Sequence, residues 1–480
     1  MVGITSYGAY IPRYRMNHNT LFTAVGFLLT FPPPGENAVA NQDEDALTMA
    51  VGAGADCLGS MKREMVDGLY LAGTSQPYVL RQNSALIATA LDLPSSIRSA
   101  DFTGSTRSGT TALLAALDAV NGETCSNVLV CASDCRLSKP GSPQEYLYGD
   151  GAASLLVGSE DVIATFEGAY SVCYDFPDRW RASTEKFEHA WEDRFIRDSG
   201  YSQFILEAIS GLLKRYNLNI KDFAKIAYPG LYPREHGAIA KRLGADPAQL
   251  QDTLLSTIGD TGAASPLMML VAALEDARPN DMILVAGFGS GSDAMFFRVT
   301  ERISEVGERR AVKKHLAAKK DLASYEKYLA FRNLAPFDLG MRGEISIRTP
   351  MSALFRERKV VLSLCGSKCR KCGTAQYPYQ RVCVNPDCGA VDQMDDYRFS
   401  DKTGVIFTYT GDYLAASMDP PSVYGLVDFE GGGRFWFDFT DCDLESVKVG
   451  MPVEMTFRRR YVDEPTGVHG YSWKATPIGG

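Results

Sequence analysis

The sequence of 480 residues is longer than a single small hydrophobic core requires, and we expect two or three domains. A formal net charge of -9 argues against the basic surface of a nucleic-acid-binding protein, so we expect no nucleic-acid partner. No window approaches the roughly 18 consecutive apolar residues of a membrane span. Residues 1–14 lack the basic and apolar segments of a signal peptide. We therefore expect a cytoplasmic protein with no membrane partner.

Residues 1–300 alternate β-branched runs with alanine- and leucine-rich runs, which is typical of an α/β fold. The runs most typical of strands lie at 69–71, 128–131, 154–157, 226–228, 283–285 and 294–297. Helices are expected in the gaps between them.

The two halves of this region share one order of features. In the first half a small-residue helix at 108–117 precedes a strand at 128–131, and in the second half a helix at 267–274 precedes a strand at 283–285. This repeat predicts a duplicated fold, with one central helix from each half packed closely between two sheets.

The stretch 101–117 starts with small polar residues and continues in an apolar pattern with helical spacing. Thr110 and Thr111 are expected to cap the start of the helix. A loop that delivers one side chain onto a helix start is typical of a nucleophile elbow. Such an elbow normally carries Ser or Cys at its tip, whereas the tip here falls on Thr106.

The composition changes at Glu301, where a charged stretch begins that we interpret as a solvated, helical connection over 301–360. Beyond it, four β-rich runs are separated by turns rich in Gly, Pro and Asp. They lie at 404–410, 422–429, 434–439 and 453–457. They predict a small β-barrel of the OB type over 396–480.

The strongest chemical signal is a pair of close cysteine pairs within 361–395. They are Cys369 with Cys372 and Cys383 with Cys388. Two thiolate pairs separated by a short loop are how a chain wraps a tetrahedral zinc ion, and four closed positions imply a structural ion. We therefore predict a zinc ribbon, with Cys365 as a bystander.

Candidate proton-transfer groups are few, because the chain has 5 histidines. His189 and His236 lie in the α/β region, although a lone histidine is more often structural. Tyr146, Tyr148 and Asp150 form a denser cluster before a glycine turn. The glycine loop Gly287-Phe288-Gly289 either makes a tight turn or presents N–H donors to a substrate oxygen, and both readings stay open.

Several segments of the first 300 residues resemble bacterial and archaeal 3-hydroxy-3-methylglutaryl-CoA synthase homologues of the thiolase superfamily. They are residues 2–15, 41–51, Ser133-Asp134, Pro140-Gly141, Glu145-Tyr146 and 175–181. The last third resembles zinc-ribbon and OB-fold proteins of the DUF35 type, here fused to the thiolase-like part. The resemblance implies a five-layered αβαβα thiolase fold with halves at 1–165 and 166–300, a coenzyme A thioester as substrate, and a homodimer or larger homo-oligomer.

The family uses a Glu, a Cys and a His, and all three positions are changed in this chain. By resemblance the Glu falls on Thr74, the Cys on Thr106 and the His on Pro229, while a supporting Asn falls on Asp260. A threonine hydroxyl without an adjacent base is a poor nucleophile. Covalent acyl transfer by the family route is therefore not expected.

Three hypotheses follow from these changes. The first is an aldolase or retro-aldolase that interconverts a β-hydroxyacyl-CoA with a carbonyl compound and a shorter acyl-CoA, without an acyl-enzyme. Its base is sought among seven residues, Asp260, His189, His236, Tyr146, Tyr148, Asp150 and Tyr232. The second is a non-catalytic acyl-CoA-binding subunit of an active thiolase-like partner. The third is a synthase-like acyltransferase in which Cys131, Cys135 or Cys173 replaces the missing nucleophile.

Overall fold

The computed structural model describes residues 1–28, 31–338, 349–415 and 417–478, and the chain divides into two compact units. The first unit comprises residues 1–41, 45–85 and 94–332. The second unit comprises residues 333–480 together with the short segments 42–44 and 86–93.

The first unit is built around a 9-stranded sheet with the order β11-β12-β13-β8-β1-β7-β6-β4-β5. The first half of the unit supplies β1 (Gly3–Tyr10), β4 (Gly68–Ala72), β5 (Arg98–Phe102), β6 (Val128–Asp134) and β7 (Gly151–Gly158). The second half supplies β8 (Ala164–Cys173), β11 (Lys225–Ala227), β12 (Met282–Phe288) and β13 (Gly291–Val299). Five of the six strands predicted from the sequence fall within these elements, and the sixth, 226–228, extends one residue beyond β11.

The strand directions confirm the internal repeat. From the centre outward, β1-β7-β6-β4 and β8-β13-β12-β11 both run as two antiparallel pairs followed by one parallel pair. The two halves join where β1 pairs with β8 through Gly3 with Thr165 and Ile4 with Ala164. Each half is thus one copy of the same sheet pattern.

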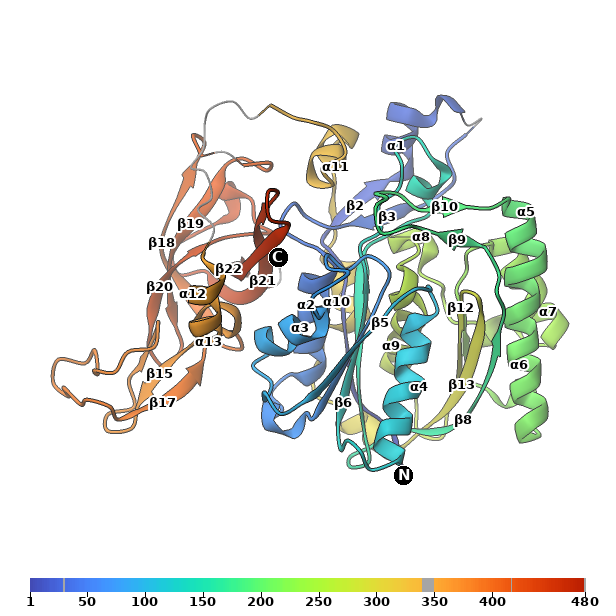
Figure 1. Cartoon of the computed structure of the whole chain (residues 1–480), viewed down its shortest axis with the longest axis horizontal. Helices are drawn as coiled ribbons and strands as arrows, with labels where there is room; N and C mark the ends of the chain where they lie inside the picture. Colours follow the sequence, from blue (N-terminus) through green and yellow to red (C-terminus); the bar gives the residue numbers. More distant parts are fainter. Residues whose placement is uncertain (29–30, 339–348, 416, 479–480) are drawn as a thin grey trace. The chain divides into compact units, whose positions relative to one another are not determined.

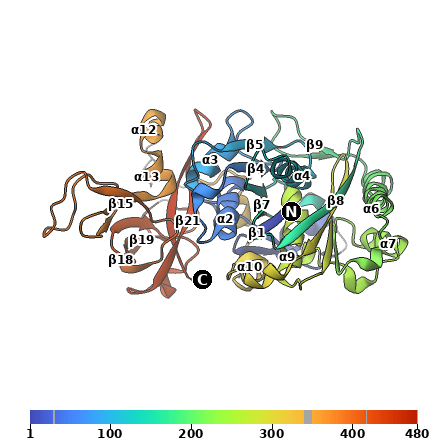
Figure 2. The ribbon, with the colours of Figure 1, turned by 90° about the horizontal axis from the view of Figure 1, so that it is seen from below.

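The two halves of the sheet are the two β layers, and helices complete the five layers αβαβα that were predicted (Figures 1 and 2). The middle layer holds α4 (Ser108–Asn121) and α9 (Ser265–Glu275), and every residue of α9 from Ser265 to Leu274 is buried. One outer layer contains α2 (Ala46–Leu58), which packs on β1, β6 and β7. The other contains α6 (Ser202–Tyr216) and α7 (Pro233–Leu243), with α6 on β8, β12 and β13.

The remaining short elements of the first unit surround these layers. They are β2 (Tyr14–Asn17), α1 (His18–Val25), β3 (Glu36–Val39), β9 (Arg179–Trp180), β10 (His189–Ala190), α5 (Asp193–Phe195) and α8 (Leu255–Ile258). Helix α3 (Asn83–Ala90) spans the boundary between the sequence segments assigned to the two units.

The predicted solvated connection at 301–360 is wrong for its first part. Residues 301–332 belong to the first unit, where α10 (Ala311–Ala317) packs on β1 and β14 (Lys320–Asp321) pairs with β2. Helix α11 (Tyr325–Phe331) buries three aromatic side chains. Apolar residues at helical spacing lie between the charged residues of this stretch, and these apolar residues pack against the first unit. Residues 339–348 lie outside the described residues.

The second unit contains two small sheets. The first sheet, of order β16-β15-β17, consists of β15 (Cys365–Cys369), β16 (Ala375–Gln376) and β17 (Met394–Arg398). The second, of order β20-β19-β18-β21-β22, consists of β18 (Gly404–Asp412), β19 (Ser422–Phe429), β20 (Arg434–Asp438), β21 (Pro452–Asp463) and β22 (Val468–Pro477). Short helices α12 (Met351–Arg356) and α13 (Arg358–Ser363) precede them.

The second sheet closes into the barrel predicted from the sequence. Burial alternates residue by residue along β19, as a strand with one covered face requires. A bridge between Phe439 and Ala475 connects the chain just after β20 with β22. Strand β22 was not predicted, because its run at 468–477 mixes polar and aromatic residues. Among the described residues, no helix has the length and apolar composition to cross a bilayer.

Gly109 marks a close approach of the two halves in the middle layer. A Cβ atom at this position would lie 2.1 Å from the backbone oxygen of Ala263. We expect Gly109→Ala to lower the free energy of unfolding of the first unit by about 3 kcal/mol, because backbone must move to relieve the contact. The check is thermal unfolding by circular dichroism.

The matched control is Gly237→Ala in α7, where a Cβ atom would meet nothing within 4 Å. Because alanine is the better helix former, this substitution is expected to stabilise the unit by up to about 1 kcal/mol. Equal destabilisation by both substitutions would contradict the close packing of the central helices.

Candidate active site and zinc centre

A narrow pocket in the first unit collects residues from distant parts of the chain. It is lined by Thr106, Asp178, Arg179, Ile196, Pro229, Leu231, Asp260, Gly262 and Phe288. Its volume of about 10 Å³ holds about one water molecule. Thr106, Pro229 and Asp260, three of the positions singled out by the family resemblance, therefore lie around one space.

Thr106 lies two residues before the first residue of α4 and against the predicted glycine loop. Its hydroxyl donates a hydrogen bond of 2.8 Å to the backbone oxygen of Phe288. Gly289 has a φ of 151°, and a Cβ atom there would lie 2.7 Å from Thr106 Oγ1. The loop therefore needs glycine both for its backbone conformation and for the approach of Thr106. A Cβ atom at Gly287 would likewise come too close to the side chain of Thr110.

Thr110 and Thr111 do not cap α4, contrary to the prediction. Both hydroxyls lie 3.0 Å from Asp293 Oδ2 of β13, to which they donate. The Asp293 carboxylate is also 3.5 Å from the guanidinium of Arg107. These contacts hold the first turn of α4 against the strand that follows the glycine loop.

Asp260, a predicted base, is held tightly by Arg136. Arg136 Nη2 donates to Asp260 Oδ2 at 2.6 Å and to the Asp260 backbone oxygen at 2.7 Å. Both side chains are buried. Two hydrogen bonds from one buried guanidinium therefore fix the position of Asp260 at the pocket wall.

Thr74 joins the same site through Asp134 at the end of β6. Asp134 Oδ1 accepts hydrogen bonds from the Thr74 backbone N–H at 2.7 Å and from the Thr74 hydroxyl at 3.1 Å. Asp134 Oδ2 accepts from the backbone N–H of Ala263 at 2.8 Å. Thr74 is thus connected through Asp134 to the turn that follows Asp260, and the roles of Asp134 and Arg136 were not predicted from the sequence. Their position directly after a buried strand was the available signal.

Asp178 is a pocket carboxyl that was not among the predicted bases. It is buried, and burial is the main cause that raises its pKa, opposed by the N–H and the guanidinium of Arg179. A carboxyl with a raised pKa accepts a proton more readily than an ordinary one. Asp178 is therefore a candidate general base in this pocket.

Tyr148 and Asp150 lie behind this pocket, in a second cavity of about 10 Å³. The Tyr148 ring lies 3.9 Å from the guanidinium carbon of Arg136, and its hydroxyl donates to Glu188 at 2.7 Å. Burial raises the pKa of Tyr148 to about 12. Asp150 forms an ion pair of 2.9 Å with Arg332. Both therefore support the site without lining the pocket.

The other predicted bases do not line the pocket. His189 is exposed on β10, 2.8 Å from Glu185, and stacks on Trp180. Tyr232 precedes α7 and donates to Asp193 at 2.9 Å. Two more lie elsewhere: the half-buried Tyr146, whose ring meets His18 edge-on, and the buried His236, whose ring stacks on Tyr228 at 4.1 Å.

Burial of His236 makes stability pH-dependent, because it lowers the pKa of the imidazole from 6.5 to about 4. The folded state prefers the neutral ring, so this stabilisation is complete above pH 6.5 and is lost as the pH falls toward 4. The full effect is about 3 kcal/mol. We expect His236→Gln to reduce the loss of thermal stability between pH 7 and pH 5. An unchanged loss of thermal stability in the His236→Gln variant over this pH range would contradict the prediction.

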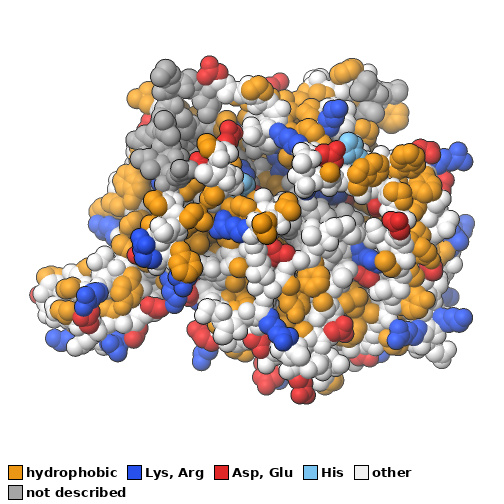
Figure 3. All heavy atoms as spheres, in the orientation of Figure 1, with side chains coloured by type: hydrophobic (Ala, Val, Ile, Leu, Met, Phe, Trp, Pro, Cys, Tyr) orange, Lys and Arg blue, Asp and Glu red, His pale blue; other side chains and the backbone are white. Residues whose placement is uncertain are grey.

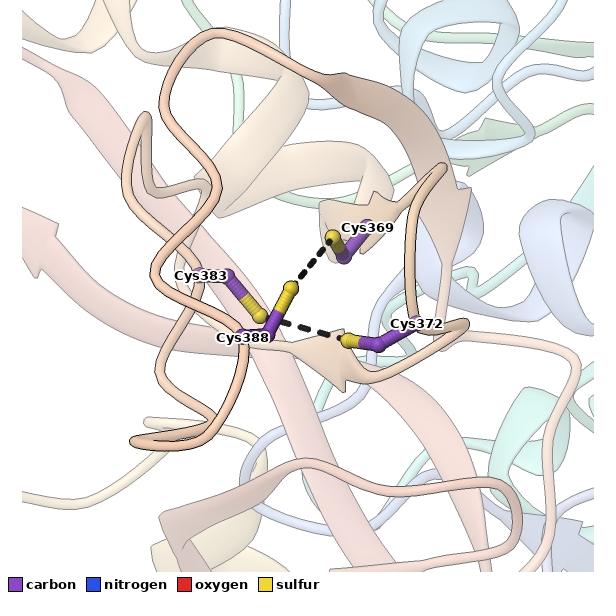
Figure 4. A group of neighbouring side chains, drawn as sticks. All are labelled: Cys369, Cys372, Cys383 and Cys388. Carbon is purple, nitrogen blue, oxygen red and sulfur yellow. Dashed lines mark hydrogen bonds between the residues drawn. The ribbon is translucent and has the colours of Figure 1, made fainter.

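The four predicted zinc ligands form one cluster (Figure 4). Their sulfur atoms all lie within 4.8 Å of one another, with Cys369 and Cys388 at 3.8 Å and Cys372 and Cys383 at 3.5 Å. Tetrahedral zinc with Zn–S bonds of about 2.3 Å places its sulfurs about 3.8 Å apart. The donor set therefore fits a structural zinc ion. Cys365 is not a member of the cluster, as expected.

Removal of this ion tests the assignment. Cys383→Ser is expected to remove bound zinc, measured by inductively coupled plasma mass spectrometry, and to expose residues 365–398 to proteolysis. The matched control is Cys365→Ser, which removes a buried thiol outside the cluster. Full zinc content in the Cys383 variant would contradict the site.

Comparison with known proteins agrees with this architecture. Residues 213–298 match the family of the 3-oxoacyl-[acyl-carrier-protein] synthase III C terminal, and residues 397–458 match the ChsH2 C-terminal OB-fold domain. The hydroxymethylglutaryl-CoA synthase of Methanopyrus kandleri is 30% identical over 348 residues, which cover 70% of this chain and 98% of that protein. The chain belongs to the hydroxymethylglutaryl-CoA synthase family.

Other members of the hydroxymethylglutaryl-CoA synthase family support the same assignment. The synthase of Thermococcus gammatolerans is 32% identical over 338 residues, covering 69% of this chain and 94% of that protein. A crystal structure of hydroxymethylglutaryl-CoA synthase complexed with CoA superimposes with a TM-score of 0.62 at 20% identity, over 73% of this chain and 94% of that one. The first unit therefore has the thiolase fold, and in this family member it is fused to an OB-fold domain.

Proposed function

We propose that this protein is an acyl-CoA enzyme that forms or breaks a carbon–carbon bond without a covalent acyl-enzyme. Its relatives are named hydroxymethylglutaryl-CoA synthases, and a structure with the same fold was solved with CoA. These names support a coenzyme A thioester as the substrate. The favoured reaction is the aldol or retro-aldol interconversion of a β-hydroxyacyl-CoA with an aldehyde or ketone and a shorter acyl-CoA.

The composition of the reaction pocket carries this proposal. Among the described residues that line it there is neither a thiol nor an imidazole. Thr106 occupies the position before α4, and its hydroxyl proton is already donated to Phe288. Without a base beside it, this hydroxyl is a poor nucleophile, whereas an aldol reaction requires none.

The alternative thiols are poorly placed for an acyltransferase. Cys131 is buried in β6, where burial raises its pKa to about 12, so it stays protonated. Cys135 is in contact with Arg332, and burial raises its pKa as well. Cys173 is exposed at the end of β8. None of the three belongs to the pocket lining.

A retro-aldol step assigns a role to each polar wall of the pocket. Asp178 removes the proton from the β-hydroxyl, the bond between Cα and Cβ breaks, and its electron pair passes to the thioester as an enolate. Protonation of the enolate at Cα by the Asp178 carboxyl completes the shorter acyl-CoA. The positive end of the α4 helix dipole next to Thr106 stabilises the enolate oxygen. Arg136 orients Asp260 at the opposite wall.

The narrowness of the pocket favours the second candidate function, a non-catalytic acyl-CoA-binding subunit. A space for about one water must widen before an acyl group can enter. In this alternative, turnover requires a thiolase-like partner that carries its own cysteine. Homodimer formation is part of either proposal.

Incubation with β-hydroxyacyl-CoAs, including 3-hydroxy-3-methylglutaryl-CoA, tests the enzyme proposal. We expect chromatography to detect a shorter acyl-CoA and a carbonyl product, and intact-mass measurement to detect no acyl adduct. Asp178→Asn is expected to lower kcat by about 10²- to 10⁴-fold, because it removes the general base. Because the pKa of Asp178 is raised, kcat/KM should begin to fall on acidification at a pH above the range in which an ordinary carboxylate takes up a proton.

The matched control for this variant is Asp175→Asn, on an exposed carboxyl three residues earlier. It should retain wild-type turnover. A stable acyl adduct would overturn the non-covalent mechanism. Turnover only after addition of a cysteine-bearing homologue would instead support the subunit.

A further inference from the structure

Arg332, the residue that follows α11, reaches into the polar network behind the reaction pocket. Its side chain is buried and binds Asp150 through both oxygens, with Nη1 to Oδ2 at 2.9 Å and Nη2 to Oδ1 at 3.3 Å. Nη2 also donates to the backbone oxygen of Arg136 at 2.7 Å, and Nη1 to Cys135 Sγ at 2.7 Å. One guanidinium thus joins the segment after β6 to the segment before β7.

Each of these two segments holds Asp260 independently. From the first, Arg136 binds the Asp260 carboxylate and backbone oxygen. From the second, the Gly149 N–H donates to the Asp260 backbone oxygen at 3.1 Å, and the Leu147 oxygen accepts from the Asp260 N–H at 2.7 Å. Asp260 is therefore held from two sides by segments that Arg332 connects.

A water molecule in the cavity between these segments cannot replace the contacts that Arg332 makes. The cavity is lined by both guanidinium groups together with Tyr148 and Asp150, and it has room for about one water molecule. Arg136 Nε and Nη1 and Arg332 Nε are buried without a hydrogen-bond partner in the protein. A single water in this cavity would satisfy part of this demand, but it would not fix the distance between the two segments as a rigid, multiply bonded guanidinium does.

We propose that Arg332 is a positioning residue for the reaction pocket, which sets the orientation of Asp260 through Arg136 and through the 147–150 segment. Arg332 follows, in the sequence, all the strands and central helices of the thiolase fold. The proposal rests on the proposed function only in that Asp260 lines the reaction pocket. The contacts themselves make a prediction that needs no substrate.

The test is amide hydrogen exchange of the full-length chain, followed by mass spectrometry of peptides covering 259–263. The Gly262 and Ala263 amides there donate to Asp260 Oδ1 and Asp134 Oδ2. With Arg332→Met we expect exchange in this peptide to rise about tenfold, and with Arg332→Lys, which keeps the charge but not the fork, by a smaller factor. Glu326→Gln, on the exposed side of α11, should leave exchange unchanged.

A peptide from α6, such as 203–215, reports global loosening. If it exchanges faster by the same factor as 259–263, Arg332 is merely structural and the proposal is overturned. Unchanged exchange at 259–263 overturns it as well. Should the Met variant fail to fold, Arg332→Lys decides by the same comparison.

A double-mutant cycle on turnover separates this proposal from the proposed function. If Arg332 acts through Asp260, the fold-loss in kcat caused by Arg332→Lys should largely disappear in an Asp260→Asn background, whereas independent effects would multiply. Multiplied losses overturn the positioning role. If the wild-type chain turns over no β-hydroxyacyl-CoA, the proposed function fails, but the exchange experiment still decides the role of Arg332.

Discussion

The contact between Gly109 and Ala263 is the constraint on which the first unit depends. At this point the middle layer leaves no room for a side chain, so α4 and the segment before α9 touch through backbone. Because each of these segments also carries one wall of the pocket, with Thr106 just before α4 and Asp260 just before the Ala263 turn, the same close packing brings the walls together. The site is a consequence of how the duplicated halves meet.

Buried ion pairs fix the positions of the segments that this packing brings together. Arg136 with Asp260 and Arg332 with Asp150 are ion pairs whose side chains are almost fully withdrawn from solvent. Removing two charges from water costs about as much as their attraction returns, so such pairs define geometry more than they add stability. In this chain they hold loops at the ends of two adjacent strands, β6 and β7, in one arrangement around the pocket.

The second unit obtains its cohesion differently. Around its cysteines the buried hydrophobic cluster is small, comprising Cys369, Cys383, Ala390 and Met394. A cluster of this size cannot offset the conformational entropy of the ribbon, whereas four thiolates around zinc can. Acidic and basic side chains are interspersed over the face drawn in Figure 3.

Sequence patterns alone predict the repeated α/β architecture, the barrel and the cysteine cluster, because their signals are local: hydrophobic period, turn residues and ligand spacing. The sequence also indicated Thr106, Pro229 and Asp260, which the tertiary structure places around one pocket. It did not reveal that Arg136 neutralises Asp260, that Asp178 lines the pocket, or that Arg332 connects the supporting segments. Those properties depend on burial and on partners more than 100 residues away in sequence, such as Arg136 for Asp260. Only the folded chain decides which charges lose their water and which partners replace it.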